Sequence, residues 1–145
     1  MTSPTALAAL KAALPDDGWT TDAARIAPKL VEWRGAWRGE TPLLLLPRTV
    51  EEVAAAVRVC VEHRLPIVPQ GGDTGLVGGQ IPQGEVLLSL ERMRSVRAVH
   101  PLEDVMIVEA GVTLLEAQQA ASAHARSFPL SLAAEGTATV GGAVS

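Results

Sequence analysis

An apolar run, a stretch with helical spacing and a second apolar run follow one another closely, and this order constrains the fold more than any other feature. Residues 42–47, PLLLLP, form a short apolar run between two prolines, which predicts a buried strand. Residues 48–63 have helical periodicity, and residues 65–69, LPIVP, predict a second strand. Because a helix connects them, we expect two parallel strands that are neighbours in one sheet.

The connecting helix carries its own start signal and an apolar face. Thr49 is expected to cap the helix, and Glu52, three residues later, completes the pattern of a capping box. The face expected to pack on the core consists of Val53, Val57, Val61 and Cys60. Cys60 is the only cysteine, which excludes an internal disulfide and favours a role as a small core residue.

The rest of the chain predicts further strands and helices. Strands are expected at residues 85–90, 94–100 and 104–111, the last two joined at the turn PLED. Helices are expected at residues 5–14 and 113–125. The face of the second of these helices consists of Leu114, Ala117, Ala121 and His124. The predicted fold class is α+β with an α/β start: a small parallel sheet followed by antiparallel strands, with flanking helices.

We divide the chain into an N-terminal helical arm, residues 1–40, and a second part, residues 41–145. Trp33 and Trp37 in the arm are four residues apart, and we expect them to pack on a helix.

Composition excludes several classes of function. The chain has 145 residues, a net charge of -4 and no basic run, which argues against nucleic acid as a partner. No apolar run approaches the roughly 20 residues of a transmembrane helix. The three histidines, at positions 63, 100 and 124, lack the spacing of metal ligands, so no metal site is predicted. With no signal-peptide pattern, the protein is expected in the cytoplasm.

A glycine-rich loop, residues 71–79, follows the second predicted strand directly. Loops at the carboxyl ends of parallel strands are where open α/β sheets bind ligands, and consecutive backbone N–H groups can form a nest for an anion. Thr74 adds a hydroxyl donor, so the loop suits a phosphate or pyrophosphate. The spacing of its glycines does not match the dinucleotide-binding fingerprint, and neither glycine-rich segment matches the P-loop motif. The alternative is a glycine-rich surface turn without a ligand.

Two stretches together, VPQGGDTGLVGGQIP and FPLSLAAEGTATVGGAVS, resemble the FAD-linked oxidases of the vanillyl-alcohol-oxidase type, which have a PCMH-type FAD-binding domain. The subgroup they resemble is the flavin dehydrogenases of D-2-hydroxy acids, such as D-lactate, glycolate and D-2-hydroxyglutarate. By this resemblance, residues 41–145 form the first part of the FAD-binding domain. It implies an oxidoreductase that transfers a hydride from a small 2-hydroxy acid to FAD, with a separate electron acceptor.

The resemblance also implies which residues hold FAD. From the first loop these are Pro69, Gln70, Gly71, Gly72, Asp73, Thr74, Gly75, Leu76, Gly78 and Gly79. From the second segment they are Gly136, Thr137, Thr139, Gly141, Gly142 and Ser145. Members that bind FAD covalently have histidine where this chain has Asp73, so non-covalent FAD is predicted. The family usually has asparagine at this position, and a carboxylate there would repel a pyrophosphate unless it turned away or were hydrogen-bonded.

Related chains continue well beyond GGAVS, and the substrate-binding, catalytic and any metal-binding residues of the family lie in that later part. We therefore assign no catalytic residue and expect the isolated chain to be inactive. Two alternatives remain open: a truncated, non-catalytic FAD-domain fragment or interaction module, and another oxidase or reductase on the same FAD fold.

Overall fold

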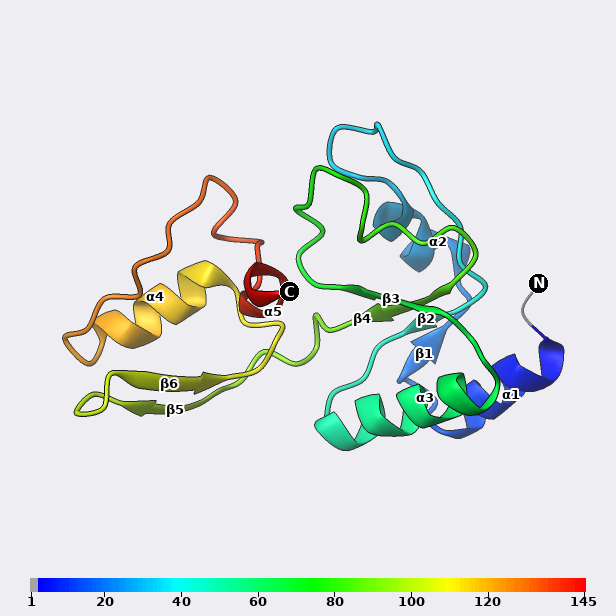
Figure 1. Cartoon of the computed structure of the whole chain (residues 1–145), viewed down its shortest axis with the longest axis horizontal. Helices are drawn as coiled ribbons and strands as arrows, with labels where there is room; N and C mark the ends of the chain where they lie inside the picture. Colours follow the sequence, from blue (N-terminus) through cyan, green and yellow to red (C-terminus); the bar gives the residue numbers. More distant parts are fainter. Residues whose placement is uncertain (1–2) are drawn as a thin grey trace.

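The structure, a computed structural model, describes residues 3–145 and consists of two lobes (Figure 1). The sheet lobe, residues 3–90, contains a four-stranded sheet with helices on both faces. The hairpin lobe, residues 94–145, contains a two-stranded hairpin and two helices. This mixed architecture confirms the α+β class, with a parallel start and an antiparallel continuation.

The sheet consists of β1 (Trp19–Thr20), β2 (Leu44–Leu45), β3 (Ile67–Gln70) and β4 (Val86–Ser89), in the order β1-β2-β4-β3. Strand β4 is parallel to both β2 and β3, while β1 is antiparallel to β2. The predicted parallel direction is confirmed, but the prediction that β2 and β3 are neighbours is wrong. All four residues of β4 are buried, so this strand takes the central place, where both of its faces are covered.

The sheet separates two apolar clusters. Helices α1 (Pro4–Ala12) and α3 (Val50–Glu62) cover one face, while α2 (Ala23–Ile26) and the 3-10 helix η1 (Ala27–Leu30) cover the other. The buried run 43–46 serves both faces, because successive side chains of a strand point in opposite directions. Leu43 and Leu45 pack beneath α1 and α3, and Leu44 and Leu46 pack beneath α2. The predicted buried strand is thereby confirmed.

Two details of α3 differ from the prediction. Ala56 and Cys60 face the core, whereas Val57 and Val61 are exposed. A row of residues spaced by four drifts about 40° per step around a helix with 3.6 residues per turn, so it leaves the core face. The Thr49 hydroxyl caps the helix as expected, but the Glu52 carboxylate accepts from the N–H of Arg48 instead of that of Thr49.

The hairpin lobe follows the prediction closely. Strands β5 (Val96–His100) and β6 (Val105–Val108) pair antiparallel, and α4 (Leu114–Ser122) packs on β5. Leu114, Ala117 and Ala121 are buried. His124, which was expected on the same face, lies beyond the last residue of the helix and is exposed. The chain then passes through a long loop to the short helix α5 (Val140–Val144).

The N-terminal arm packs against the rest of the sheet lobe. Helix α1 contacts α3, and β1 extends the sheet, so the two parts share one core. The first two residues of the arm lie outside the described part, and the division between residues 40 and 41 remains a proposal. Trp33 and Trp37 are not on a helix: residues 32–37 form a loop closed by a bridge between Val31 and Arg38. Gly35, at φ 72°, makes the reversal in this loop.

Candidate functional site

A cleft of about 600 Å³ lies where the two lobes meet. Its first wall is the glycine loop that leaves the carboxyl end of β3, and its second wall is the end of the chain around α5 (Figure 1). Sequence analysis placed the candidate ligand site in these same two segments. The structure brings them together although they are more than 60 residues apart in the chain.

The glycine loop offers a run of free donors to this cleft. The backbone N–H groups of residues 71–79 donate no hydrogen bond to any residue that the structure describes. Backbone N–H groups that lack a partner inside the protein are donors for a ligand or for water. A series of them in one loop forms a concave site for an anion, which supports the predicted phosphate or pyrophosphate site.

Two glycines of the loop are also needed for contact between the lobes. A Cβ atom on Gly71 would overlap the Thr139 hydroxyl, and one on Gly72 would overlap the Thr137 carbonyl oxygen. These positions therefore let the two segments of the cleft approach each other. By contrast, a Cβ atom on Gly79 would meet no atom within 4 Å, although this glycine lines the cleft. Gly79 thus leaves space that a ligand can enter.

The second segment contributes surface more than donors. The N–H groups of Val140 and Gly141 donate to the carbonyl oxygens of Val112 and Ala110, at 2.8 and 2.9 Å. The N–H of Gly142 donates to the Thr139 hydroxyl at 3.3 Å. Gly141 has no room for a Cβ atom, which would lie 2.8 Å from the Ala110 carbonyl oxygen. The segment therefore forms a close wall opposite the glycine loop, with most of its own donors already used.

Most of the predicted site residues line the cleft. They are Pro69, Gln70, Gly71, Gly72, Asp73, Thr74, Gly75, Gly79, Thr139, Gly141, Gly142 and Ser145. Four lie outside its lining: Leu76, Gly78, Gly136 and Thr137. The cleft is also lined by residues that were not predicted from the sequence: Val77, Gln80, Leu90, Ala110, Leu132, Ala138 and Ala143.

Of the missed residues, Gln80 had a signal, since it follows the last pair of glycines directly. Val77 lies within the glycine loop, and Leu132, Ala138 and Ala143 lie within the second segment. Leu90 and Ala110 lie outside both segments and reach the cleft through tertiary packing.

The loop 32–37 supports the glycine loop from outside. Arg34 donates to the Leu76 carbonyl oxygen, and the Trp37 ring lies against Gly78, where a Cβ atom would be 2.5 Å from the ring. Glu32 is almost fully buried and accepts from the N–H groups of Arg34 and Ala36, at 3.1 and 3.2 Å. Burial acts to raise the pKa of Glu32, but these bonds and the Arg34 guanidinium outweigh it and lower the pKa.

Two side chains at the start of the glycine loop have oxygens without partners. Gln70 is 1% exposed, and its amide nitrogen donates to the carbonyl oxygens of Lys29 and Gln80, at 2.9 and 3.2 Å. Its Oε1 has no partner among the described residues. The Oδ1 atom of Asp73 is also buried without a partner. Buried polar atoms are normally hydrogen-bonded, so these two are candidates for contact with a ligand.

Asp73 also has an unusual backbone and an unusual environment. Its φ is 53°, in the left-handed region that aspartate and asparagine enter more readily than most residues. Burial raises the pKa of its carboxyl above the usual 3.8, and Glu32 adds to the rise; the Gln80 amide and the Lys29 ammonium act in the opposite direction. Asp73 is the only ionisable residue among those that line the cleft.

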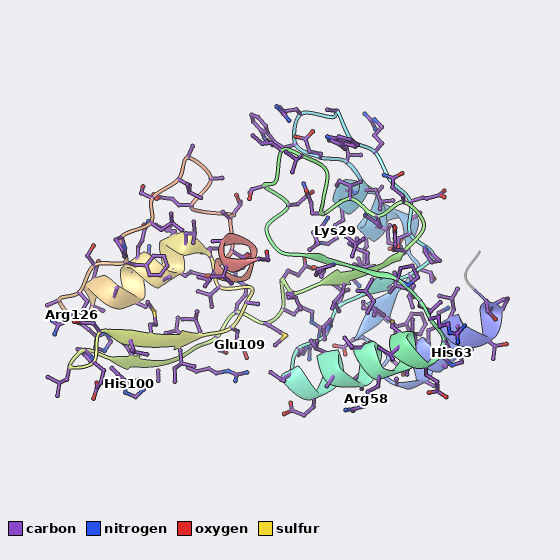
Figure 2. The ribbon with its side chains drawn as sticks, viewed as in Figure 1. Lys29, Arg58, His63, His100, Glu109 and Arg126 are labelled. Atoms are coloured by element: carbon purple, nitrogen blue, oxygen red, sulfur yellow. The ribbon has the colours of Figure 1, made fainter. Side chains whose placement is uncertain are left out.

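The described residues show neither a metal site nor a membrane span. His63, at the end of α3, and His100, in β5, lie in different lobes (Figure 2). In residues 3–145, no three His, Cys, Asp or Glu side chains are grouped so that they could hold a metal ion. None of the helices in this range is both long and apolar enough to cross a membrane.

The model of one protein family, described as FAD binding domain, matches residues 41–145. The chain belongs to this family. D-2-hydroxyglutarate dehydrogenase of Bos taurus, named as mitochondrial, is 38% identical over 95% of the chain and 25% of its own length. A Schizosaccharomyces pombe protein, named as a mitochondrial D-lactate dehydrogenase, is 36% identical over 85% of the chain and 24% of its own length.

Among solved structures, alkyldihydroxyacetonephosphate synthase matches 98% of the chain and 29% of its own chain, with a TM-score of 0.85 and 22% identity. This likeness shows the fold alone. The chain spans about a quarter of the length of the two curated dehydrogenases it matches. The resemblance to flavin dehydrogenases of D-2-hydroxy acids is confirmed, as is FAD as the cofactor of the family. The expectation of a cytoplasmic location is wrong by this comparison, because both relatives are named as mitochondrial.

The residues present fit the diphosphate of FAD. The cleft combines free backbone donors at residues 71–79 with open space at Gly79. It offers no cationic side chain, so an anion would be held by amide dipoles.

Proposed function

We propose that this chain holds the diphosphate of FAD, without a covalent link, in an oxidoreductase that oxidises a D-2-hydroxy acid. The observation that carries the proposal is the run of free backbone N–H groups at residues 71–79, most of which belong to residues lining a cleft between the lobes. The names of two relatives, one for D-2-hydroxyglutarate and one for D-lactate, support the substrate class.

Each part of the cleft has its own task in this proposal. The glycine loop binds the diphosphate through its amides, and the second segment closes the site from the other side. Gly78, a predicted site residue outside the cleft lining, packs against the Trp37 ring and helps to hold the loop in shape. When bound, FAD would supply the redox chemistry of the reaction, which is acceptance of a hydride from the α-carbon of the substrate and transfer of the electrons to a further acceptor. Within this chain we assign no side chain to the catalytic step.

Cofactor binding can be tested on the complete gene product with two alanine variants. The purified protein is expected to show flavin absorbance and to release FAD on denaturation. Gly79→Ala places a methyl group in open space within the cleft. Loss of one amide contact of about 1.5 kcal/mol would weaken FAD binding about tenfold.

Gly136→Ala is the matched comparison, because it also has free space around it but lies outside the cleft lining. It is expected to change the affinity less. A colourless protein that takes up no FAD would refute the proposal. Equal FAD affinities for the two variants would refute the assignment of the diphosphate to this cleft.

The substrate class needs a separate experiment. Under anaerobic conditions, D-2-hydroxyglutarate or D-lactate is expected to bleach the flavin absorbance, and the L enantiomers are expected to leave it unchanged. If neither D-hydroxy acid reduces a flavin that the protein binds firmly, the cofactor assignment stands and the chemistry is another one on the same fold.

A further inference from the structure

Asp73 is an acidic residue in a cleft that suits an anion. It is the only ionisable residue lining the cleft, and its neighbours in the loop offer free N–H donors. An ionised carboxylate there would repel a diphosphate or compete with it for those donors. A neutral carboxylic acid would instead supply an additional O–H donor.

The surroundings of Asp73 favour the neutral acid. Its Oδ1 atom is buried and accepts no hydrogen bond from any of residues 3–145. The charged groups that face it are the Lys29 ammonium and the Glu32 carboxylate. Lys29 is engaged by the Glu91 carboxylate, so its charge is shared with another acid. Burial has the largest effect and raises the pKa of Asp73, as does Glu32; the Gln80 side chain and Lys29 lower it, and the net shift is upward. The arrival of a diphosphate adds further negative charge.

We propose that Asp73 joins the FAD complex as a neutral carboxylic acid that donates a hydrogen bond to the diphosphate, so that binding takes up one proton. This inference rests on the proposed function, since it needs FAD in this cleft. The proton comes from solvent, remains on the Asp73 carboxyl while the cofactor is bound, and returns to solvent on release. The covalent bonds of the cofactor are unchanged.

The sign of the pH dependence follows from this proton. The pKa of Asp73 is higher in the complex than in the free protein, so binding weakens as pH rises between the two values. Because one proton is taken up on binding, FAD affinity falls by at most about tenfold for each unit that the pH rises within this window. Glu32 does not contribute, because its pKa is lowered and it stays ionised over the same range.

The test compares two aspartate-to-asparagine variants of the complete gene product. Asp73→Asn keeps the shape and the donor but cannot titrate. Asp104→Asn is the matched control, because Asp104 has the same φ of 53° and lies in the turn between β5 and β6, outside the cleft lining. FAD titration calorimetry from about pH 5 to about pH 8, in buffers of different ionisation enthalpy, gives both the affinity and the number of protons taken up.

We expect proton uptake and a falling affinity in the wild type and in Asp104→Asn. In Asp73→Asn we expect no proton uptake, a flat profile and tighter binding than wild type at the highest pH. FAD binding without proton uptake in the wild type, or an equal slope in Asp73→Asn, would overturn this inference and leave the proposed function standing. No FAD binding by any of the three proteins at any pH would overturn both.

Discussion

The contact between Gly72 and the second segment allows a prediction whose magnitude follows from the structure. In Gly72→Ala, the new Cβ atom would overlap the Thr137 carbonyl oxygen and lie 2.6 Å from the carbonyl carbon and 3.2 Å from the Cα atom of Ala138. These neighbours are backbone atoms, so no side-chain rotation relieves the overlap. The two segments would have to separate by about 1 Å or more to restore ordinary contact distances.

The expected cost to lobe docking is about 2 kcal/mol. Overpacking of a well-packed site costs about 1–3 kcal/mol, and a backbone obstacle puts this one toward the upper end. Restricting the unfolded chain by replacing glycine with alanine returns about 0.4–1 kcal/mol. Gly72 does not have a positive φ, so backbone strain adds nothing further.

Hydrogen exchange measures this effect locally, on the complete gene product. The N–H of Leu114 donates to Ala138 and that of Val140 donates to Val112, so both amides report on the second segment. A loss of 2 kcal/mol corresponds to roughly 30-fold faster exchange where opening and reclosing are fast compared with exchange itself. With FAD removed from both proteins, Gly79→Ala, whose new Cβ atom meets no protein atom, is expected to exchange like wild type. Both hydrogen bonds lie within the hairpin lobe, so wild-type exchange rates in Gly72→Ala would refute the argument that the overlap displaces the second segment.

Three further predictions concern stability. Leu87→Ala removes a fully buried side chain from the central strand and is expected to lower the free energy of unfolding by about 3 kcal/mol, measured by denaturant titration. The Thr49 hydroxyl caps α3 by accepting a hydrogen bond from the N–H of Glu52 at 3.2 Å. Thr49→Ala removes this cap and is expected to lower the free energy of unfolding by about 1 kcal/mol in the same assay. Glu116→Gln is expected to destabilise the protein at neutral pH, because the N–H of Thr113 and the Arg94 guanidinium lower the pKa of Glu116 below its usual 4.5. A carboxyl whose pKa is lowered by folding stabilises the fold at pH values above its ordinary pKa of 4.5. The difference in the free energy of unfolding between wild type and Glu116→Gln should therefore shrink as pH falls below 4.5. A difference that stays constant with pH would contradict this.

The local features of the fold could be predicted from the sequence because their causes are local. The hairpin at residues 96–108, the cap at Thr49 and the buried run 43–46 depend on neighbouring residues. The strand order could not be predicted in this way. Strand β4 lies between β2 and β3 because it is buried on both faces, which depends on helices from elsewhere in the chain.

In the candidate site, too, some features could be predicted from local sequence and others depend on tertiary packing. Glycine content located the loop, but it did not distinguish the reasons for the individual glycines. Gly71 and Gly72 face the second segment, whereas Gly79 faces open space. Leu90 and Ala110 of the cleft carry no local signal, because only tertiary packing brings them there.

The two walls of the cleft belong to different lobes, and this makes the cofactor part of the energetics of assembly. A ligand that binds only the docked lobes stabilises the docked state by thermodynamic linkage, by about 2.7 kcal/mol at a concentration 100 times its dissociation constant. Substitutions far from the cleft that loosen docking would therefore lower cofactor occupancy without touching the ligand. The flavin content of the purified protein would then report the fraction of molecules in which the two lobes are docked.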